Sequence, residues 1–227
     1  MTAVRSGAPP TTKHRVLLVD DHPIVRQGLT LLINQEPDLV VCGEADGGDA
    51  ALDAIASLTP DVVVLDISLP GPDGMELLKI VRAINAELPI LVLSMHDESI
   101  YAERSLRAGA NGYIMKQEAT ENVLVALRRI LGREIYVSDR IASRMLQRMV
   151  SGRTRPSQPA IASLSDRELE VFRLIGAGRG TREIAEELHL SVKTVESYTA
   201  HIKEKLSLDS ARALLQRAIE WRLSEGS

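Results

Sequence analysis

The sequence predicts an α/β domain built on a parallel five-stranded sheet, followed by a small all-α domain. Over residues 15–131, short apolar runs alternate with helical stretches, whereas only helical patterns remain from residue 163 onward. Strands and helices that alternate at this spacing indicate a doubly wound sheet with helices on both faces. The length of 227 residues is enough for two ordinary domains.

The expected elements follow in order along the chain. The five strands are apolar runs near residues 15–19, 39–44, 61–66, 90–94 and 111–115, each followed by a helical stretch. A further helix is predicted at 139–150, and a polar tether with two prolines comes after it. The domain boundaries expected from this pattern are a disordered leader at 1–13, a first domain at 14–131, a linker at 132–162 and a second domain at 163–227.

Capping signals define the helices of the second domain. Ser165 and Glu168 form a capping box that opens the first helix. Thr181 is the expected cap of the second helix, and Ser191 is the expected cap of the third. Two helices joined by a turn of about three residues form a helix-turn-helix arrangement.

The third helix of this domain divides into a core face and an outward face. Val195, Thr199, Ile202 and Leu206 share one side, which we expect to face the core. The other side can enter a major groove with its N-terminal part, while flanking cations reach phosphates. The residues assigned to DNA contact are Lys193, Thr194, Glu196, Ser197, Tyr198, Ala200, His201, Lys203 and Lys205.

Carboxylates follow two of the predicted strands. Asp20 and Asp21 come directly after the first strand, and Asp66 ends the third. Because neighbouring parallel strands end at the same edge of a sheet, we expect the three side chains to converge there. Three uncompensated negative charges repel one another, so the cluster needs a hard divalent cation such as Mg²⁺.

Two further strand ends add a hydroxyl and an ammonium to this pocket. Ser94 ends the fourth strand, and Lys116 follows the fifth. A carboxylate nucleophile, a cation and two groups that hold phosphoryl oxygens can together receive a phosphoryl group on an aspartate. His22 and Cys42 are interpreted as structural residues, one at a helix start and one in a buried strand.

Composition limits the remaining classes of protein. The single cysteine excludes an internal disulfide, and no apolar run reaches the ~20 residues of a membrane helix. We therefore expect a cytoplasmic protein with no membrane partner. Residues 163–227 hold 10 basic against 11 acidic side chains, so any DNA affinity must come from local placement and from dimerisation.

Several motifs of the first domain occur together and in order. They are Asp20-Asp21-His22-Pro23, Asp66, Pro70 to Gly74, Ser94, and Ala108 to Lys116. Through them, residues 14–131 resemble the receiver domain of bacterial response regulators. The resemblance implies a flavodoxin-like strand order.

The second domain resembles the LuxR-type DNA-binding domain. The resemblance rests on Leu164 to Val171, Glu183-Ile184-Ala185, Ser191 to Tyr198 and Lys205-Leu206. A receiver followed by this domain is the layout of the NarL/FixJ-type response regulators. It implies a transcription regulator and not an enzyme, with at most self-dephosphorylation of the aspartyl phosphate. The implied partners are a sensor histidine kinase, promoter DNA, a second copy of the chain and RNA polymerase.

The resemblance also implies a role for each residue of the pocket. Asp66 is the phosphoacceptor, and Ser94 and Lys116 bind the phosphoryl oxygens. Ser94 and Tyr113 form the conformational switch. Mg²⁺ is held by Asp20 (through a water), Asp21, Asp66 and the backbone carbonyl of Ser68.

Rival classes lack residues that they require. A phosphatase of the haloacid-dehalogenase class needs a second aspartate where Ser68 stands, and a dinucleotide oxidoreductase needs G-x-G-x-x-G after the first strand. One alternative stays open: a DNA-binding regulator that works without phosphorylation and uses its receiver only for dimerisation.

Overall fold

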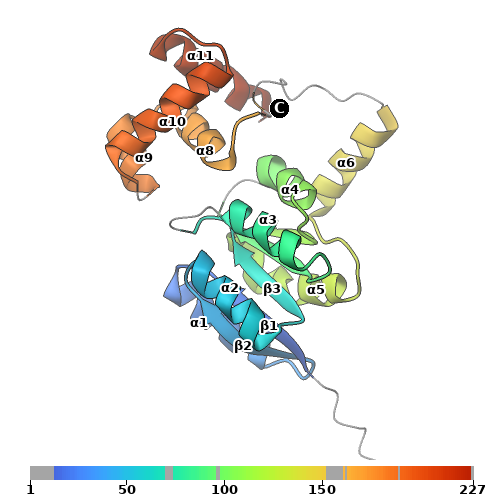
Figure 1. Ribbon diagram of the computed structural model, residues 1–227. Helices are drawn as coiled ribbons and strands as arrows, with labels where there is room; N and C mark the ends of the chain where they lie inside the picture. Colours follow the sequence, from blue (N-terminus) through green and yellow to red (C-terminus); the bar gives the residue numbers. More distant parts are fainter. Residues whose placement is uncertain are drawn as a thin grey trace, which may run out of the picture. The chain divides into compact units, whose positions relative to one another are not determined.

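The computed structural model describes residues 13–69, 74–95, 98–151, 161, 163–188 and 190–225 (Figure 1). The chain forms two compact units that divide after Ile141. Within the described residues, no helix is both long and apolar enough to cross a lipid bilayer.

The first unit contains a five-stranded sheet in the order β2-β1-β3-β4-β5, and all neighbouring strands pair in parallel. This order confirms the expected fold. The strands are β1 (His14–Val19), β2 (Leu39–Ala45), β3 (Val62–Asp66), β4 (Ile90–Ser94) and β5 (Gly112–Met115). The inner strands β3 and β4 are buried along their whole length, as expected when helices cover both faces of the sheet, whereas the edge strand β2 is only partly buried.

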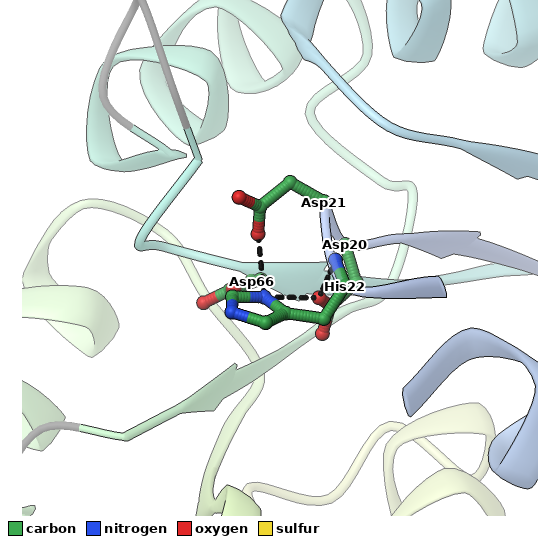
Figure 2. A group of neighbouring side chains, drawn as sticks. All are labelled: Asp20, Asp21, His22 and Asp66. Carbon is green, nitrogen blue, oxygen red and sulfur yellow. Dashed lines mark hydrogen bonds and ion pairs between the residues drawn. The ribbon is translucent and has the colours of Figure 1, made fainter. Parts of the chain in front are cut away.

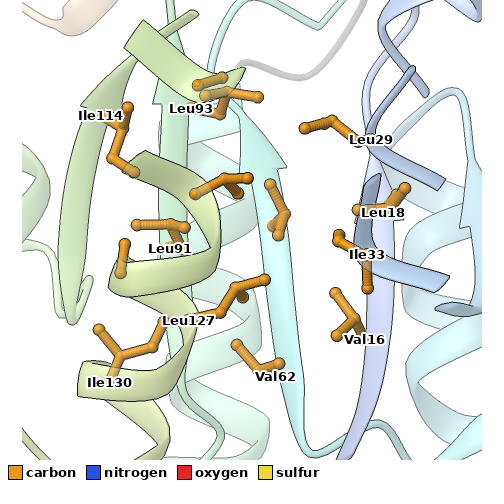
Figure 3. Packing of buried hydrophobic residues seen from close by; sticks show 14 of the residues in the cluster. Val16, Leu18, Leu29, Ile33, Val62, Leu91, Leu93, Ile114, Leu127 and Ile130 are labelled. Atoms are coloured by element: carbon orange, nitrogen blue, oxygen red, sulfur yellow. The ribbon is translucent and has the colours of Figure 1, made fainter. Parts of the chain in front are cut away.

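Helices follow the strands and bury their apolar sides against the sheet. α1 and α5 contact each other on one face, where Leu29, Ile33, Leu127 and Ile130 cover strand residues such as Val16 (Figure 3). α2 and α3 also contact each other. The helices are α1 (Pro23–Asn34), α2 (Gly48–Leu58), α3 (Gly74–Ile84), α4 (Glu98–Arg107) and α5 (Ala119–Leu131), with the short 3₁₀ helix η1 (Lys116–Glu118) before α5.

The second unit is helical. α6 (Asp139–Ser151) begins in the first unit and ends in the second, and it confirms the helix expected there. After it come α8 (Asp166–Gly176), α9 (Thr181–Glu187), α10 (Val192–Lys205) and α11 (Ala211–Glu225). The rings of Phe172 on α8 and Trp221 on α11 pack against each other in a tilted arrangement, with centroids 5.6 Å apart. A Cβ at Gly176 would come within 2.6 Å of a backbone oxygen of α11, so this close helix contact requires glycine.

The helix caps confirm two expectations and correct a third. The capping box of Ser165 and Glu168 is present, and Ser191 caps α10. Thr181, in contrast, is the first residue of α9, and Gly180 is its cap. The carboxylate of Glu183 accepts the Gly180 N–H at 2.7 Å, which moves the start of the helix one residue toward the N-terminus.

Some expectations fall on residues outside the described ranges. These are the leader up to residue 12, the loop at 70–73, most of the tether at 151–159, and His189 in the turn between α9 and α10.

Candidate functional site

Three strand ends bring charged side chains together at the carboxyl edge of the sheet. Asp20 follows β1, Asp66 ends β3, and Lys116 comes directly after β5. The Lys116 ammonium lies 2.7 Å from Asp20 Oδ2 and 2.7 Å from Asp66 Oδ2. All three side chains are almost fully buried. Lysine therefore neutralises part of the acidic charge that the sequence places here.

Asp20 and Asp66 each also accept a backbone hydrogen bond from the loop that follows them. The Ser68 N–H donates to Asp66 Oδ1 at 2.8 Å, and the His22 N–H donates to Asp20 Oδ1 at 2.8 Å. Gly74, the first residue of α3, lies so close to β3 that a Cβ there would be 2.4 Å from the Asp66 carbonyl oxygen. These contacts hold two carboxylates at fixed positions in the pocket.

The electrostatics of the pocket are set by burial and by the lysine. Burial raises the pKa of Asp66; Lys116 opposes this effect but does not cancel it. Burial by itself lowers the pKa of Lys116, but Asp66 and Asp20 outweigh it and hold that pKa above its usual value. A buried carboxylate beside other acids gains from a further cation.

A metal ion fits the donor set of the pocket. Ligand atoms of Asp20, Asp21, His22 and Asp66 all lie within 4.8 Å of one another. His22 Nδ1 lies 2.7 Å from Asp21 Oδ1 and 3.2 Å from Asp20 Oδ1 (Figure 2). Clustered carboxylate oxygens are the ligands that Mg²⁺ prefers. The position of His22 at the start of α1 predicts a structural role, and no local signal in the sequence indicates the approach of its ring to Asp21.

The other predicted residues of the site lie on β4 and β5 and directly after β3. Ser94 ends β4 and is fully buried, and it pairs in register with Met115, the residue before Lys116. Tyr113 of β5 is 1% exposed. Ser68 lies beside Asp66 through its N–H; metal binding by its carbonyl stays a prediction.

α10 presents the two faces that its sequence predicts. Val195 and Ile202 are fully buried, and Thr199 donates to the Val195 carbonyl at 2.8 Å. The expected outward residues Lys193, Glu196, Ser197, Ala200 and His201 are exposed, whereas Thr194, Tyr198 and Lys203 are half-buried.

Lys205 is engaged within the domain. Its ammonium lies 2.7 Å from Glu168 Oε2, the same oxygen that accepts the Ser165 N–H of the capping box. Burial would raise the pKa of Glu168, but Lys205 and Ser165 outweigh it and hold the pKa below its usual value. This ion pair ties the end of α10 to the start of α8.

Comparisons with known proteins agree with both halves of the chain. The response regulator receiver domain family matches residues 16–128, and the luxR family of bacterial regulatory proteins matches residues 162–218. A receiver joined to a LuxR-type DNA-binding domain defines a transcriptional response regulator of a two-component system. The chain belongs to the NarL/FixJ-type response regulators.

Individual relatives match most of the chain. The oxygen regulatory protein NreC of Staphylococcus aureus is 35% identical over 215 residues, which are 93% of this chain and 99% of the relative. A LuxR-family two-component response regulator from Aurantimonas sp. SI85-9A1 is 36% identical, with a TM-score of 0.57, over 61% of this chain and 99% of that one. RcsB of Salmonella enterica serovar Typhimurium, solved on the promoter rprA with the phosphomimetic BeF₃⁻, is 29% identical, with a TM-score of 0.58, over 90% and 98%.

Proposed function

We propose that Asp66 is the phosphoacceptor through which a sensor histidine kinase controls DNA binding by this regulator. The observation that carries the proposal is the burial of Asp66 beside Asp20 and Lys116, with Lys116 Nζ 2.7 Å from each carboxylate. A carboxylate oxygen of Asp66 attacks the phosphorus of a phosphohistidine in line. The P–O bond to Asp66 forms as the P–N bond to histidine breaks.

Asp20, Asp21, Asp66 and the Ser68 carbonyl would hold Mg²⁺, which supplies positive charge for the phosphoryl oxygens when it is bound. Lys116 lies at the acceptor already and, with the Ser94 hydroxyl, binds oxygens of the new phosphoryl group. Water later attacks the phosphorus and returns the Asp66 carboxylate and inorganic phosphate. This self-dephosphorylation is the only chemistry that the domain needs after phosphorylation.

The test for the acceptor is intact mass after incubation with acetyl phosphate and Mg²⁺. The wild-type chain should gain the mass of one phosphoryl group, and Asp66→Asn should gain none because an amide is not a nucleophile. Asp61→Asn is a matched control, since Asp61 is an exposed aspartate that accepts from the Arg15 N–H. Equal labelling of wild type and Asp66→Asn would remove Asp66 from this role.

The same experiment decides between the proposal and the alternative left open by the sequence. A regulator that uses its receiver only for dimerisation would show no gain in mass with any phosphodonor. Burial of Asp66 beside Asp20 and Lys116 favours the phosphoacceptor, because a mere dimerisation module has no need for buried acids.

We propose further that α10 reads promoter DNA in the major groove, as a dimer of this chain. The exposed Glu196 lies in the N-terminal half of α10 and can accept from a cytosine amino group, a contact worth ~1–3 kcal/mol of discrimination. Lys203 reaches phosphate instead. A single domain with almost no net charge makes few phosphate contacts, and two copies supply twice as many. The two DNA half-sites bound by the dimer then lie about one helical turn apart.

Binding titrations over single-base variants of a selected site separate these roles. Glu196→Ala should relax preference at one position per half-site. Lys203→Ala should weaken all sites alike and reduce the salt slope by about one. Glu204→Ala is the control, since Glu204 is also exposed but lies near the C-terminal end of α10. Unchanged preference in Glu196→Ala would exclude it from base recognition.

A further inference from the structure

The segment that follows α5 is bound to the edge strand of the sheet. The Tyr136 N–H donates to the Asn111 carbonyl at 3.0 Å, and the Tyr136 carbonyl accepts from the Tyr113 N–H at 2.9 Å. A Cβ at Gly112 would lie 2.9 Å from the Tyr136 carbonyl oxygen, so only glycine permits this approach. The chain that leads toward the DNA-binding domain therefore leaves the receiver along β5.

The same segment is attached to the start of α4. Arg140, the second residue of α6, donates through Nε to Glu98 Oε1 at 2.9 Å. Glu98 is the first residue of α4, and its side chain is only 8% exposed, against 65% for Arg140. Ile141 beside Arg140 is buried as well.

These attachments involve the two elements that lead away from the charged pocket. β5 carries Tyr113 and ends next to Lys116, while α4 starts four residues after Ser94, the end of β4. A change at Ser94 or Lys116 therefore reaches the first turn of α6 through few intermediate groups.

We infer that Arg140 is a positioning residue that ties α6 to α4, so that phosphorylation of the receiver is passed to the linker. The inference rests on the proposed function of Asp66. Glu98 is buried, so a displacement of α4 either carries Arg140 with it or leaves a buried carboxylate without this partner, which is costly. Because the Arg140 side chain is exposed, the ion pair can also break. α6 can therefore take two arrangements, one with the pair formed and one with it broken.

Hydrogen exchange in the full-length chain tests the inference, with beryllium fluoride and Mg²⁺ as the phosphoryl analogue. In wild type the analogue should change the exchange rate of the amides at 139–147. In Arg140→Gln that change should shrink by roughly threefold to tenfold, while calorimetry shows that the analogue still binds within about twofold of wild type. Arg140→Lys should restore most of the response, because the charge is kept.

Arg133→Gln is the matched control. Arg133 lies on the same segment and pairs with Glu87 at 2.6 Å, but both side chains of that pair are well exposed. Its exchange response should equal that of wild type. The double variant Arg140→Gln with Glu98→Gln should lose no more of the response than Arg140→Gln does, because the two side chains act as one pair.

Two results would overturn the inference, and they differ from failure of the proposed function. If wild type responds and Arg140→Gln responds equally, or if Arg133→Gln loses the response too, the ion pair is not the connection. If wild type itself neither binds the analogue nor accepts phosphate at Asp66, the proposed function fails and the inference falls with it.

Discussion

Replacing Lys116 by methionine should destabilise the receiver strongly in the absence of divalent cations. The ammonium lies 2.7 Å from Asp20 and 2.7 Å from Asp66, and all three side chains are buried. Breaking a buried ion pair from one side typically costs 3–5 kcal/mol, because a charge is left uncompensated. Protonation of Asp66 and burial of the methionine side chain recover part of this, so we expect a loss of about 3 kcal/mol at neutral pH.

The loss should depend on pH in a defined direction. In wild type, burial raises the pKa of Asp66 above its ordinary value of 3.8, although Lys116 partly opposes this effect. Without the ammonium of Lys116, the pKa of Asp66 in the variant is higher still. An acid whose folded-state pKa is raised destabilises the fold progressively as pH rises above its unfolded-state value. The difference between variant and wild type should therefore be large at neutral pH and shrink as the pH falls toward 4.

Urea unfolding curves measure these differences. Mg²⁺ at about a hundred times its dissociation constant should return about 2.7 kcal/mol to the variant. Lys79→Met is the control, because Lys79 is an exposed lysine 3.9 Å from Glu76, and it should change stability by less than about 1 kcal/mol. If Lys116→Met costs as little as Lys79→Met, or if its cost is the same at low and neutral pH, the buried ammonium does not stabilise the receiver in this way.

Two predictions concern structural contacts away from the pocket. Gly109 has a φ of 103°, and a Cβ there would lie 2.6 Å from Arg82 Cγ. Gly109→Ala should therefore lower the free energy of unfolding in urea by about 2–3 kcal/mol. Gly178 has a φ of 82° but open space around it, so Gly178→Ala should lower it by only about 1–2 kcal/mol. Glu168→Gln should cost the second domain about 1 kcal/mol above pH 5, since the Lys205 end of its ion pair is 40% exposed. Because Glu168 has a lowered pKa, that difference should vanish as the pH falls through its folded-state value, and thermal unfolding at two pH values will show whether it does.

Local patterns in the sequence were sufficient to predict the strands, the acids at their ends and most helix caps. The apolar run Val62 to Leu65 predicts a buried strand, and Asp66 comes directly after it. The position of Asp66 at the carboxyl edge of the sheet follows from this pattern. The cap of α9 shows the precision of such rules. They favour a threonine cap at Thr181, but Gly180 adopts the extended backbone needed and Glu183 captures its N–H, so the helix starts one residue earlier.

Contacts between distant segments could not be predicted in the same way. The ion pair of Lys205 with Glu168 joins residues 37 positions apart, whereas the helix face alone predicts that Lys205 contacts DNA. The residues around a lysine on a polar helix face do not indicate that it will pair with a buried acid of another helix. The place of Lys116 in the pocket follows from its position after a strand, but its bridge to both Asp20 and Asp66 depends on strand order and on side-chain geometry.

Whether phosphorylation of Asp66 controls DNA binding can be measured in a single titration. The full-length chain is titrated onto a selected promoter duplex with Mg²⁺, with and without acetyl phosphate, beside Asp66→Asn under the same conditions. Wild type should gain affinity on phosphorylation by about 5- to 150-fold, the range of a coupling of 1–3 kcal/mol, and Asp66→Asn should gain none. Equal DNA affinity of phosphorylated and unphosphorylated wild type, with one phosphoryl group confirmed by mass, would show that phosphorylation of Asp66 does not control DNA binding.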